Sequence, residues 1–293
     1  MQLWQAVILG LVEGITEYLP VSSTGHLIIT GDLLGLDKPE TKDALNAFNI
    51  IVQGGAILAV LGLYFPRFVR MLMGLLGRDP VGFKMFANVV VAFLPAAVVG
   101  LALNKVIEAK LFHLGPVVFS LVVGGLFMIG VEIWRRSRPP GKGGVEGIGG
   151  KSVEDMTVFD ALFVGVLQIV AMWPGTSRSM MTITAGYFRG LKPSAAAEFS
   201  FLLGMPTLLA ATLYKLYKDV SNNDPGHESF ITVLGVTPVL VGIAVAAVSA
   251  AIAVKWLVGF LTRHGLAPFG YYRIVLGIVM LILALSGFVT VNA

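Results

Sequence analysis

The chain has no cysteine among its 293 residues. This absence excludes disulfide bonds, thiolate metal sites and a cysteine nucleophile. Charge is also scarce, because only 13% of the residues are Asp, Glu, Lys or Arg, whereas a soluble domain has about 25%. The net charge is only +4 and its basic residues are scattered along the chain, which argues against a nucleic-acid partner.

Apolar residues dominate the composition, at 56% of the chain with a mean hydropathy of +0.84. A disordered chain lacks such residues, so disorder is excluded as well. Six apolar runs reach the length of about 20 residues that an α-helix needs to span a bilayer. These runs cover residues 44–64, 83–103, 115–134, 194–217, 230–254 and 268–291. The sequence therefore predicts an all-α polytopic membrane protein.

Two further apolar stretches, residues 2–36 and 156–190, are interrupted near the middle by short polar segments. The first segment begins at Pro20 and reads PVSSTG, and the second begins at Pro174 and reads PGTSRS. Non-helical backbone at membrane depth is tolerated where it lines a cavity inside the protein. We therefore predict that each stretch is a re-entrant helical hairpin. The alternative is ten full spans with both polar segments in water.

The two broken stretches also indicate an internal repeat. A shift of 154 residues places Pro20 on Pro174, a shift of 151 places Phe48 on Phe199, and these matches keep their order along the chain. Each half then holds one hairpin and three spans, which is an odd number of crossings. The second half is therefore predicted to be inverted relative to the first. The predicted units are a first repeat at residues 1–134, a linker at 135–155 and a second repeat at 156–293.

Basic residues in the predicted loops lie mainly on one side of this topology, thirteen against six. The positive-inside rule places the thirteen in the cytoplasm and both termini outside. The Gly- and Arg-rich linker at 135–155 is then a flexible cytoplasmic connection. The two remaining basic residues, Arg178 and Arg273, fall in apolar surroundings. Arg273 is predicted either to pair with Glu198 or to lie near a membrane interface.

Glu13 and Glu17 are four residues apart, so they share one face of the first broken helix. Ionised side chains within a bilayer are normally paired or solvated in a cavity, and they mark functional sites. Two carboxylates this close repel each other, so the site favours a shared proton or a divalent cation such as Mg²⁺ or Ca²⁺. The structural alternative is that the acids pair with Arg178 and only hold the halves together.

Hydroxyl side chains and a histidine follow the acids, and a similar set with an arginine occupies the second polar segment. Helix N-termini favour phosphate, and a guanidinium grips its oxygens. Each Ser or Thr taken alone is better explained as a helix cap. However, hairpin tips of an inverted repeat can meet near the midplane, where they would form one phosphate-binding pocket. The predicted residues are Ser22, Ser23, Thr24, His26, Thr176, Ser177, Arg178 and Ser179.

The segments EGITEYLPVSSTGH and PGTSRS, with the hydrophobic layout of nearly the whole chain, resemble the undecaprenyl-diphosphate phosphatase family, also called bacitracin-resistance proteins. The resemblance implies an enzyme of the bacterial inner membrane with its active site open to the periplasm. It implies hydrolysis of the diphosphate of the C55 lipid carrier to undecaprenyl phosphate and inorganic phosphate, for peptidoglycan synthesis. The family's paired acids fall on Glu13 and Glu17, its Ser/His motif on residues 22–26, and its arginine motif on Ser177 and Arg178.

For this chemistry we predict a catalytic set of Glu17, Ser23, His26 and Arg178. Arg178 and the loop N–H groups would hold the phosphate oxygens, and Ser23 is the candidate nucleophile, with His26 or Glu17 taking its proton. A directly attacking water is the alternative nucleophile. A divalent cation on Glu13 and Glu17 would bridge the phosphates. The expected partners are the membrane and a polyprenyl diphosphate lipid.

The rival function is a transporter or lipid flippase for an anionic substrate, because inverted repeats with broken helices are also typical of secondary transporters. Gln168 lies in the second broken helix near the place that the glutamates occupy in the first, and it is interpreted as a vestige of a repeat that lost its acids. The glycine pairs Gly54-Gly55 and Gly124-Gly125 indicate close helix packing, either within the chain or in a homodimer.

Overall fold

The computed structural model describes residues 1–36, 42–111, 113–137, 150–221 and 229–286, and within these residues the chain folds into twelve α-helices. Six of the helices are long and apolar enough to cross a membrane, which confirms the prediction of an all-α multi-pass membrane protein. The helices of the first half are α1 (Leu3–Thr16), α2 (Ser23–Leu33), α3 (Lys42–Leu63), α4 (Phe65–Leu75), α5 (Pro80–Leu111) and α6 (Leu114–Arg136). Those of the second half are α7 (Val158–Val170), α8 (Arg178–Phe188), α9 (Pro193–Val220), α10 (Phe230–Leu234), α11 (Val236–His264) and α12 (Ala267–Leu285).

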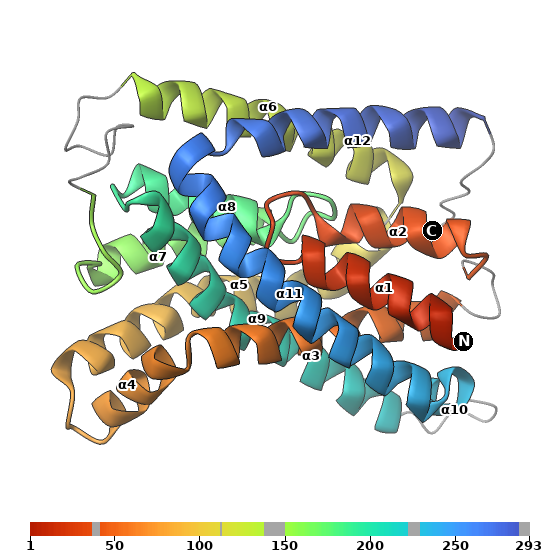
Figure 1. Ribbon diagram of the computed structural model, residues 1–293, viewed down its shortest axis with the longest axis horizontal. Helices are drawn as coiled ribbons and strands as arrows, with labels where there is room; N and C mark the ends of the chain where they lie inside the picture. Colours follow the sequence, from red (N-terminus) through yellow and green to blue (C-terminus); the bar gives the residue numbers. More distant parts are fainter. Residues whose placement is uncertain (37–41, 112, 138–149, 222–228, 287–293) are drawn as a thin grey trace.

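Two short helix pairs, α1–α2 and α7–α8, run from opposite ends of the molecule to its middle (Figure 1). α1 and α7 have 14 and 13 residues and α2 and α8 have 11 each. At 1.5 Å per residue such helices are about 17–21 Å long, well short of a hydrocarbon core of about 30 Å. The structure therefore favours re-entrant hairpins over ten full spans. The start of α1 and the end of α12 lie at the same end of the molecule (Figure 1).

The first helix of each hairpin packs mainly against the opposite half of the chain. α1 packs against α11, whereas α7 packs against α5. Glycines permit the close approach in both places, because a Cβ on Gly10 would lie 2.6 Å from the carbonyl oxygen of Gly242, and a Cβ on Gly165 would collide with the backbone of Ala92. This exchange of partners is consistent with two related halves. Their inverted orientation in a bilayer stays a prediction.

The fifth span differs from the predicted residues 230–254. It begins at Val236 and continues to His264. The apolar run at its start is divided by Gly235, whose φ of 83° belongs to the left-handed region that interrupts a helix, so residues before it form the separate α10. At the other end Gly265, with φ 73°, ends the helix. The last span ends at Leu285, and the predicted extension to residue 291 lies outside the described residues.

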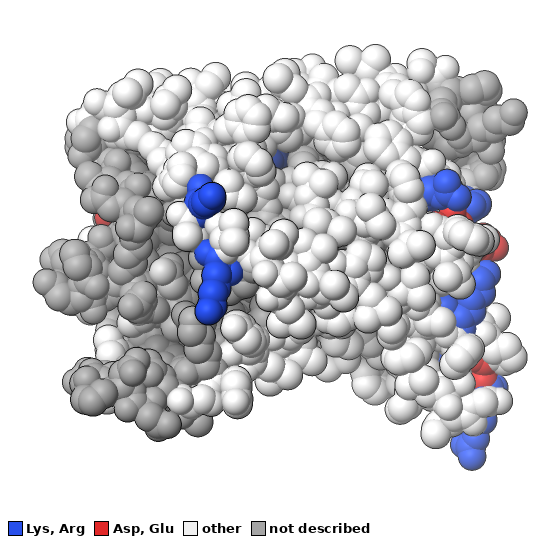
Figure 2. Space-filling view, turned by 180° about the vertical axis from the view of Figure 1, so that it is seen from behind, with Lys and Arg blue, Asp and Glu red and all other residues white. Residues whose placement is uncertain are grey.

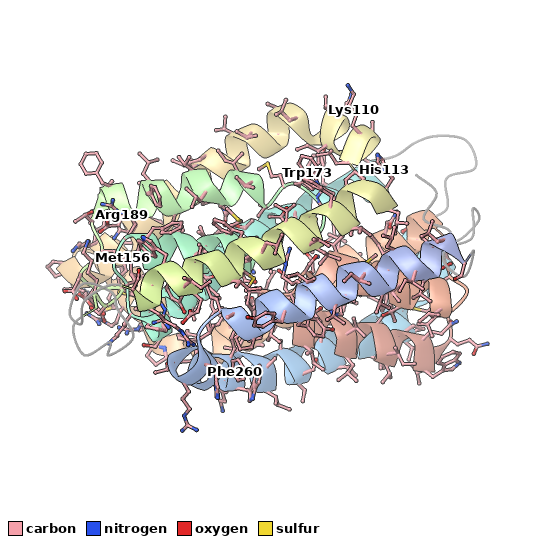
Figure 3. The ribbon with its side chains drawn as sticks, turned by 90° about the horizontal axis from the view of Figure 1, so that it is seen from above. Lys110, His113, Met156, Trp173, Arg189 and Phe260 are labelled. Atoms are coloured by element: carbon pink, nitrogen blue, oxygen red, sulfur yellow. The ribbon has the colours of Figure 1, made fainter. Side chains whose placement is uncertain are left out.

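Charged side chains gather near two opposite ends of the molecule, with a broad uncharged band between them (Figure 2). Met156 and Arg189 mark one end, and Lys110 and His113 mark the other (Figure 3). This is the distribution of a protein whose middle faces lipid. Most of the predicted linker, residues 138–149, lies outside the described residues. Its C-terminal part is anchored, because the backbone of Lys151 hydrogen-bonds with Gly190 and Lys192.

Gly55, Gly124 and Gly125 contribute to packing within the chain, whereas nothing lies within 4 Å of a Cβ at Gly54. A Cβ on Gly55 would collide with the backbone of α11 at Ile243. Gly124 and Gly125 lie against α12, where a Cβ on Gly125 would be 2.6 Å from the carbonyl oxygen of Gly270. The homodimer stays a prediction.

Candidate active site

The first hairpin turns at Ser22, immediately before α2. Ser22 has a φ of 73°, an unusual conformation for a residue other than glycine. Its hydroxyl accepts a hydrogen bond from the backbone N–H of Gly25 at 3.3 Å, so it caps the helix. The cap leaves Ser23 as the first residue of α2, at the positive end of the helix dipole.

The second hairpin turns in the same way at Ser177, with φ 74° and a hydroxyl that accepts from the backbone N–H of Met180 at 3.3 Å. The first residue of α8 is therefore Arg178. This geometry corrects the repeat register at the tips from 154 to 155 residues, because Ser22 corresponds to Ser177 rather than to Thr176. The second segment has one more residue between its proline and its capping serine than the first. An alignment of the two prolines therefore places the capping serines out of register.

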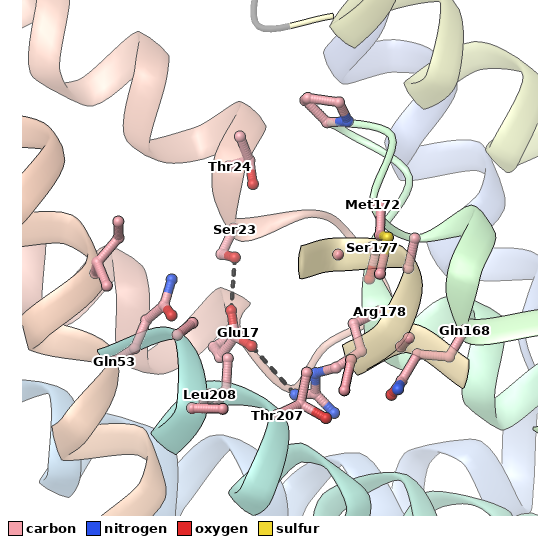
Figure 4. Close-up of a pocket in the computed structure, with 18 of the residues that line it drawn as sticks. Glu17, Ser23, Thr24, Gln53, Gln168, Met172, Ser177, Arg178, Thr207 and Leu208 are labelled. Atoms are coloured by element: carbon pink, nitrogen blue, oxygen red, sulfur yellow. Dashed lines mark hydrogen bonds and ion pairs between the residues drawn. The ribbon is translucent and has the colours of Figure 1, made fainter. Parts of the chain in front are cut away.

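The tips of the hairpins meet at Glu17, which lies just after α1. The hydroxyl of Ser23 donates a hydrogen bond to Oε2 of Glu17 at 2.7 Å, and Nη2 of Arg178 donates to Oε1 at 3.1 Å (Figure 4). One carboxylate thus binds residues that are 155 positions apart in the sequence. The prediction that Ser23 and Arg178 come together is confirmed. The ion pair between Glu17 and Arg178 is also the contact that the structural alternative predicted, in which the acids hold the two halves together.

The guanidinium of Arg178 is fixed on several sides. Its Nη1 donates to the carbonyl oxygen of Ser200 at 2.9 Å, and its Cζ lies 5.5 Å from the centre of the Tyr18 ring, a cation–π distance. Gly204 in α9 leaves the space for the group, because a Cβ there would lie 2.6 Å from Nη1. Nε has no hydrogen-bond partner among the described residues. Nε is thus a buried donor whose hydrogen bond the described residues leave unmade.

Ser23, Glu17 and Arg178 line a cavity of about 620 Å³, a size typical of small-ligand sites. The hairpins contribute many of its polar groups, including Ser22, Thr24, Ser177 and Gln168, and Figure 4 also shows Gln53 of α3 and Thr207 of α9. Its other walls come mainly from α5 and α9 and are largely apolar, with Phe93, Ala96, Leu101 and Leu208 among them. The cavity therefore combines a charged centre with apolar walls, which suits an anionic group attached to a hydrophobic chain.

His26, which is predicted to be catalytic, lies outside this group of contacts. Its Nδ1 lies 2.7 Å from the carbonyl oxygen of Ser22 and its Nε2 lies 2.6 Å from the hydroxyl of Tyr272. Both ring nitrogens are thus engaged, and His26 does not line the cavity. The partner in α12 is 246 residues away, so the sequence around His26 could not show this orientation.

Thr176 and Ser179 are also buried without lining the cavity. The hydroxyl of Ser179 donates to the carbonyl oxygen of Leu19 at 2.9 Å, which joins the second tip to the first. The backbone N–H of Thr176 donates to the carbonyl oxygen of Trp173 at 3.1 Å. In this structure both residues shape the tips rather than offer their side chains to a ligand.

Glu13 is fully buried one helical turn before Glu17, and neither of its carboxylate oxygens has a hydrogen-bond partner among the described residues. A buried carboxylate without a partner is costly, so Glu13 fits a proton or a cation. The described residues contain no cluster of three or more His, Cys, Asp or Glu side chains that could hold a metal ion. Two carboxylates nevertheless suit Mg²⁺, which usually keeps several waters and takes substrate phosphates as ligands.

Arg273 supports the second tip instead of pairing with Glu198. Its Nη2 donates to the carbonyl oxygens of Ser120 at 2.9 Å and Gly175 at 2.8 Å, and its side chain is fully buried. Glu198 binds Arg67 at 2.7 Å. The sequence did not indicate this role of Arg273, nor those of Ser200 and Gly204. Arg273 binds backbone carbonyls, Ser200 offers its own carbonyl to Arg178, and Gly204 leaves room for the guanidinium, and none of these contacts has a sequence signal.

The fold and the cavity define a class: a multi-pass membrane protein that gathers an acid, a hydroxyl and a guanidinium at the meeting point of two hairpins. Comparison with known proteins identifies the family. Residues 6–279 match the family model for the bacitracin resistance protein BacA, and the chain belongs to that family.

Curated relatives support this membership over nearly the full length. An undecaprenyl-diphosphatase of Sorangium cellulosum is 45% identical over 95% of this chain and 85% of the relative. Undecaprenyl-diphosphatase 2 of Rhodospirillum rubrum is 44% identical over 100% of this chain and 99% of the relative. An undecaprenyl-diphosphatase of Neisseria gonorrhoeae is 42% identical, with 98% of this chain and 97% of the relative covered.

Proposed function

We propose that this chain is an integral membrane phosphatase that hydrolyses undecaprenyl diphosphate to undecaprenyl phosphate and inorganic phosphate. The observation that carries the proposal is the carboxylate of Glu17, which binds the hydroxyl of Ser23 and the guanidinium of Arg178 in one cavity. The names of the relatives supply the substrate. The apolar walls suit the prenyl chain, and the polar centre suits its diphosphate.

The contacts support Ser23 as the nucleophile and Glu17 as its base. The Oγ of Ser23 would attack the terminal phosphorus while Glu17 takes the hydroxyl proton, and the bond to the bridging oxygen would break. Undecaprenyl phosphate leaves, and water then hydrolyses the phosphoserine to inorganic phosphate and free Ser23. Arg178 would neutralise the charge on the transferred group through its unpaired edge. His26, which is held by Ser22 and Tyr272, would act by shaping the tip.

The carboxylates of Glu13 and Glu17 would hold a divalent cation such as Mg²⁺ or Ca²⁺. When bound, such a cation supplies neutralising charge for the diphosphate. The fully buried oxygens of Glu13, without partners among the described residues, support this assignment. A chelator should remove most of the activity and added Mg²⁺ should restore it, whereas full turnover in excess chelator would contradict the role of the metal.

We place the protein in the bacterial inner membrane with both termini in the periplasm, where it would recycle the lipid carrier for peptidoglycan synthesis and confer bacitracin resistance. The excess of basic residues in loops on the opposite side supports this orientation. A C-terminal tag that is protected from protease in intact spheroplasts, but cleaved after lysis, would reverse it.

Phosphate release by the purified protein decides between a phosphatase and a transporter. In detergent, with a soluble short-chain prenyl diphosphate, we expect steady release of inorganic phosphate that Arg178→Ala lowers strongly. A transporter or flippase with the same architecture would bind the substrate and release none. The Arg178→Ala protein, prepared in parallel, controls for a contaminating phosphatase.

A further inference from the structure

Gln168, in α7, is a buried amide in the wall of the cavity. Only 2% of its surface is exposed, yet it lines the cavity with Glu17 and Arg178. Neither its Nε2 nor its Oε1 has a hydrogen-bond partner among the described residues. A buried amide without a partner is unfavourable, and a ligand in the adjoining cavity would complete its hydrogen bonds.

The tip geometry gives Gln168 a defined counterpart in the first hairpin. With the shift of 155 residues that superposes Ser22 on Ser177, Gln168 corresponds to Glu13. Both side chains are buried and unpartnered among the described residues, but one is a carboxylate and the other an amide. A carboxylate repels a phosphate, whereas the N–H group of an amide donates to it. An amide at this position would therefore be able to bind a phosphate, which is an alternative to the vestige that the sequence suggested.

Arg178 lines the same cavity and also has a nitrogen without a hydrogen-bond partner. Nη1 and Nη2 are engaged by Ser200 and Glu17, and Nε has no partner among the described residues. In Figure 4 Gln168 stands on the side of Arg178 away from Glu17. The second hairpin thus has N–H donors on two side chains, Gln168 and Arg178. Both groups suit a phosphate, because its oxygens accept hydrogen bonds.

We propose that Gln168 is a substrate-binding residue whose Nε2 donates a hydrogen bond to a phosphate oxygen of the prenyl diphosphate, beside Arg178. The proposal rests on the proposed phosphatase function. In this proposal the first hairpin supplies the acids and the nucleophile. The second hairpin supplies the side chains that donate hydrogen bonds to the substrate.

Two variants of Gln168 test the hydrogen bond with a short-chain prenyl diphosphate in detergent. Gln168→Leu should lower kcat/KM by roughly 10- to 100-fold, which is the value of a hydrogen bond to a charged group, mainly through KM. Gln168→Glu keeps the shape of the side chain but places a carboxylate at the phosphate. At pH 8 its kcat/KM should therefore be lower than that of Gln168→Leu. Its activity relative to the wild type should recover as the pH falls and the added carboxyl gains a proton to donate. Gln168→Leu should show no such recovery.

Asn88→Leu is the matched control, because Asn88 is an amide in α5 with 1% of its surface exposed that does not line the cavity. It should lose thermal stability but keep the wild-type KM. A wild-type KM in both Gln168 variants, or a pH-independent loss of equal size in both, would overturn the proposal.

Binding is measured separately, by the thermal stabilisation that a non-hydrolysable prenyl methylenediphosphonate gives. Wild-type protein should be stabilised, and Gln168→Leu should need a roughly 10- to 100-fold higher concentration for the same effect. This assay reports on Gln168 even if no phosphate is released, a result that would overturn the phosphatase function alone. If Gln168→Leu does not fold, the isosteric Gln168→Glu carries the test through its pH profile. Equal stabilisation of wild-type and variant protein would overturn the role of Gln168.

Discussion

Ser22 and Ser177 share a left-handed backbone conformation and a capping role, yet the helices on either side of them carry different chemistry. After the cap, the first hairpin presents Ser23 and the second presents Arg178. Before the cap, Glu13 in the first hairpin corresponds to Gln168 in the second. The two halves thus keep one backbone and divide the chemistry, with acids and a hydroxyl on one tip and hydrogen-bond donors on the other.

The difference also explains why neither hairpin would suffice alone. A guanidinium at a helix N-terminus is unfavourable because the helix dipole is positive there. Glu17 from the other hairpin compensates Arg178 through their ion pair, and the two side chains are 7% and 10% exposed. The N-terminus of α8 therefore carries an unfavourable charge that is compensated only by a residue from the other half of the chain. Such a conflict between local and tertiary interactions is characteristic of functional sites.

Removal of the Glu17 carboxylate, which both hairpin tips share, should lower the activity most. Glu17→Gln keeps the shape but cannot take the proton of Ser23, so we expect kcat/KM to fall about 10³-fold, or about 4 kcal/mol of transition-state free energy. The fold should survive with a lower melting temperature, because the amide can still accept a hydrogen bond from Arg178 but no longer balances its charge. Phosphate-release kinetics and the melting temperature measure the two effects. Near-normal turnover would remove Glu17 from the mechanism.

Replacement of the arginine by another cation tests whether the second tip supplies geometry or only charge. Arg178→Lys keeps the charge but loses the planar set of donors that binds Glu17 and Ser200 and would bind the substrate at the same time. We expect kcat/KM to fall about 10²-fold. If the lysine variant were as active as the wild type, a simple counter-ion would account for Arg178.

A smaller effect is expected from filling the space that Arg178 occupies. Gly204→Ala places a methyl group against Nη1 of Arg178, which should displace the guanidinium and lower kcat/KM about 10-fold. Gly62→Ala in α3 is the matched control, because nothing lies within 4 Å of a Cβ at that position. If both variants behave alike in kinetic assays, the packing of Gly204 does not position Arg178.

Much of the site was predictable because polar residues stand out in an apolar chain. Glu17, Ser23 and Arg178 lie in long apolar stretches, where a charge or a proline-led polar segment has few structural uses. Orientation and register were harder, because they depend on contacts across the fold. His26 is turned by Tyr272, the break before α11 comes from the φ of Gly235, and the 155-residue register follows from the caps.

The central claim is that one active site is made by the tips of both hairpins, and a double-mutant cycle tests it most directly. The measurement is kcat/KM for Ser23→Ala, Arg178→Ala and the double variant, with phosphate release from a short-chain prenyl diphosphate. Residues that act as one catalytic unit are strongly non-additive. The account predicts that the double variant is about as slow as the slower single variant. A double variant whose loss equals the product of the two single losses would contradict a shared site.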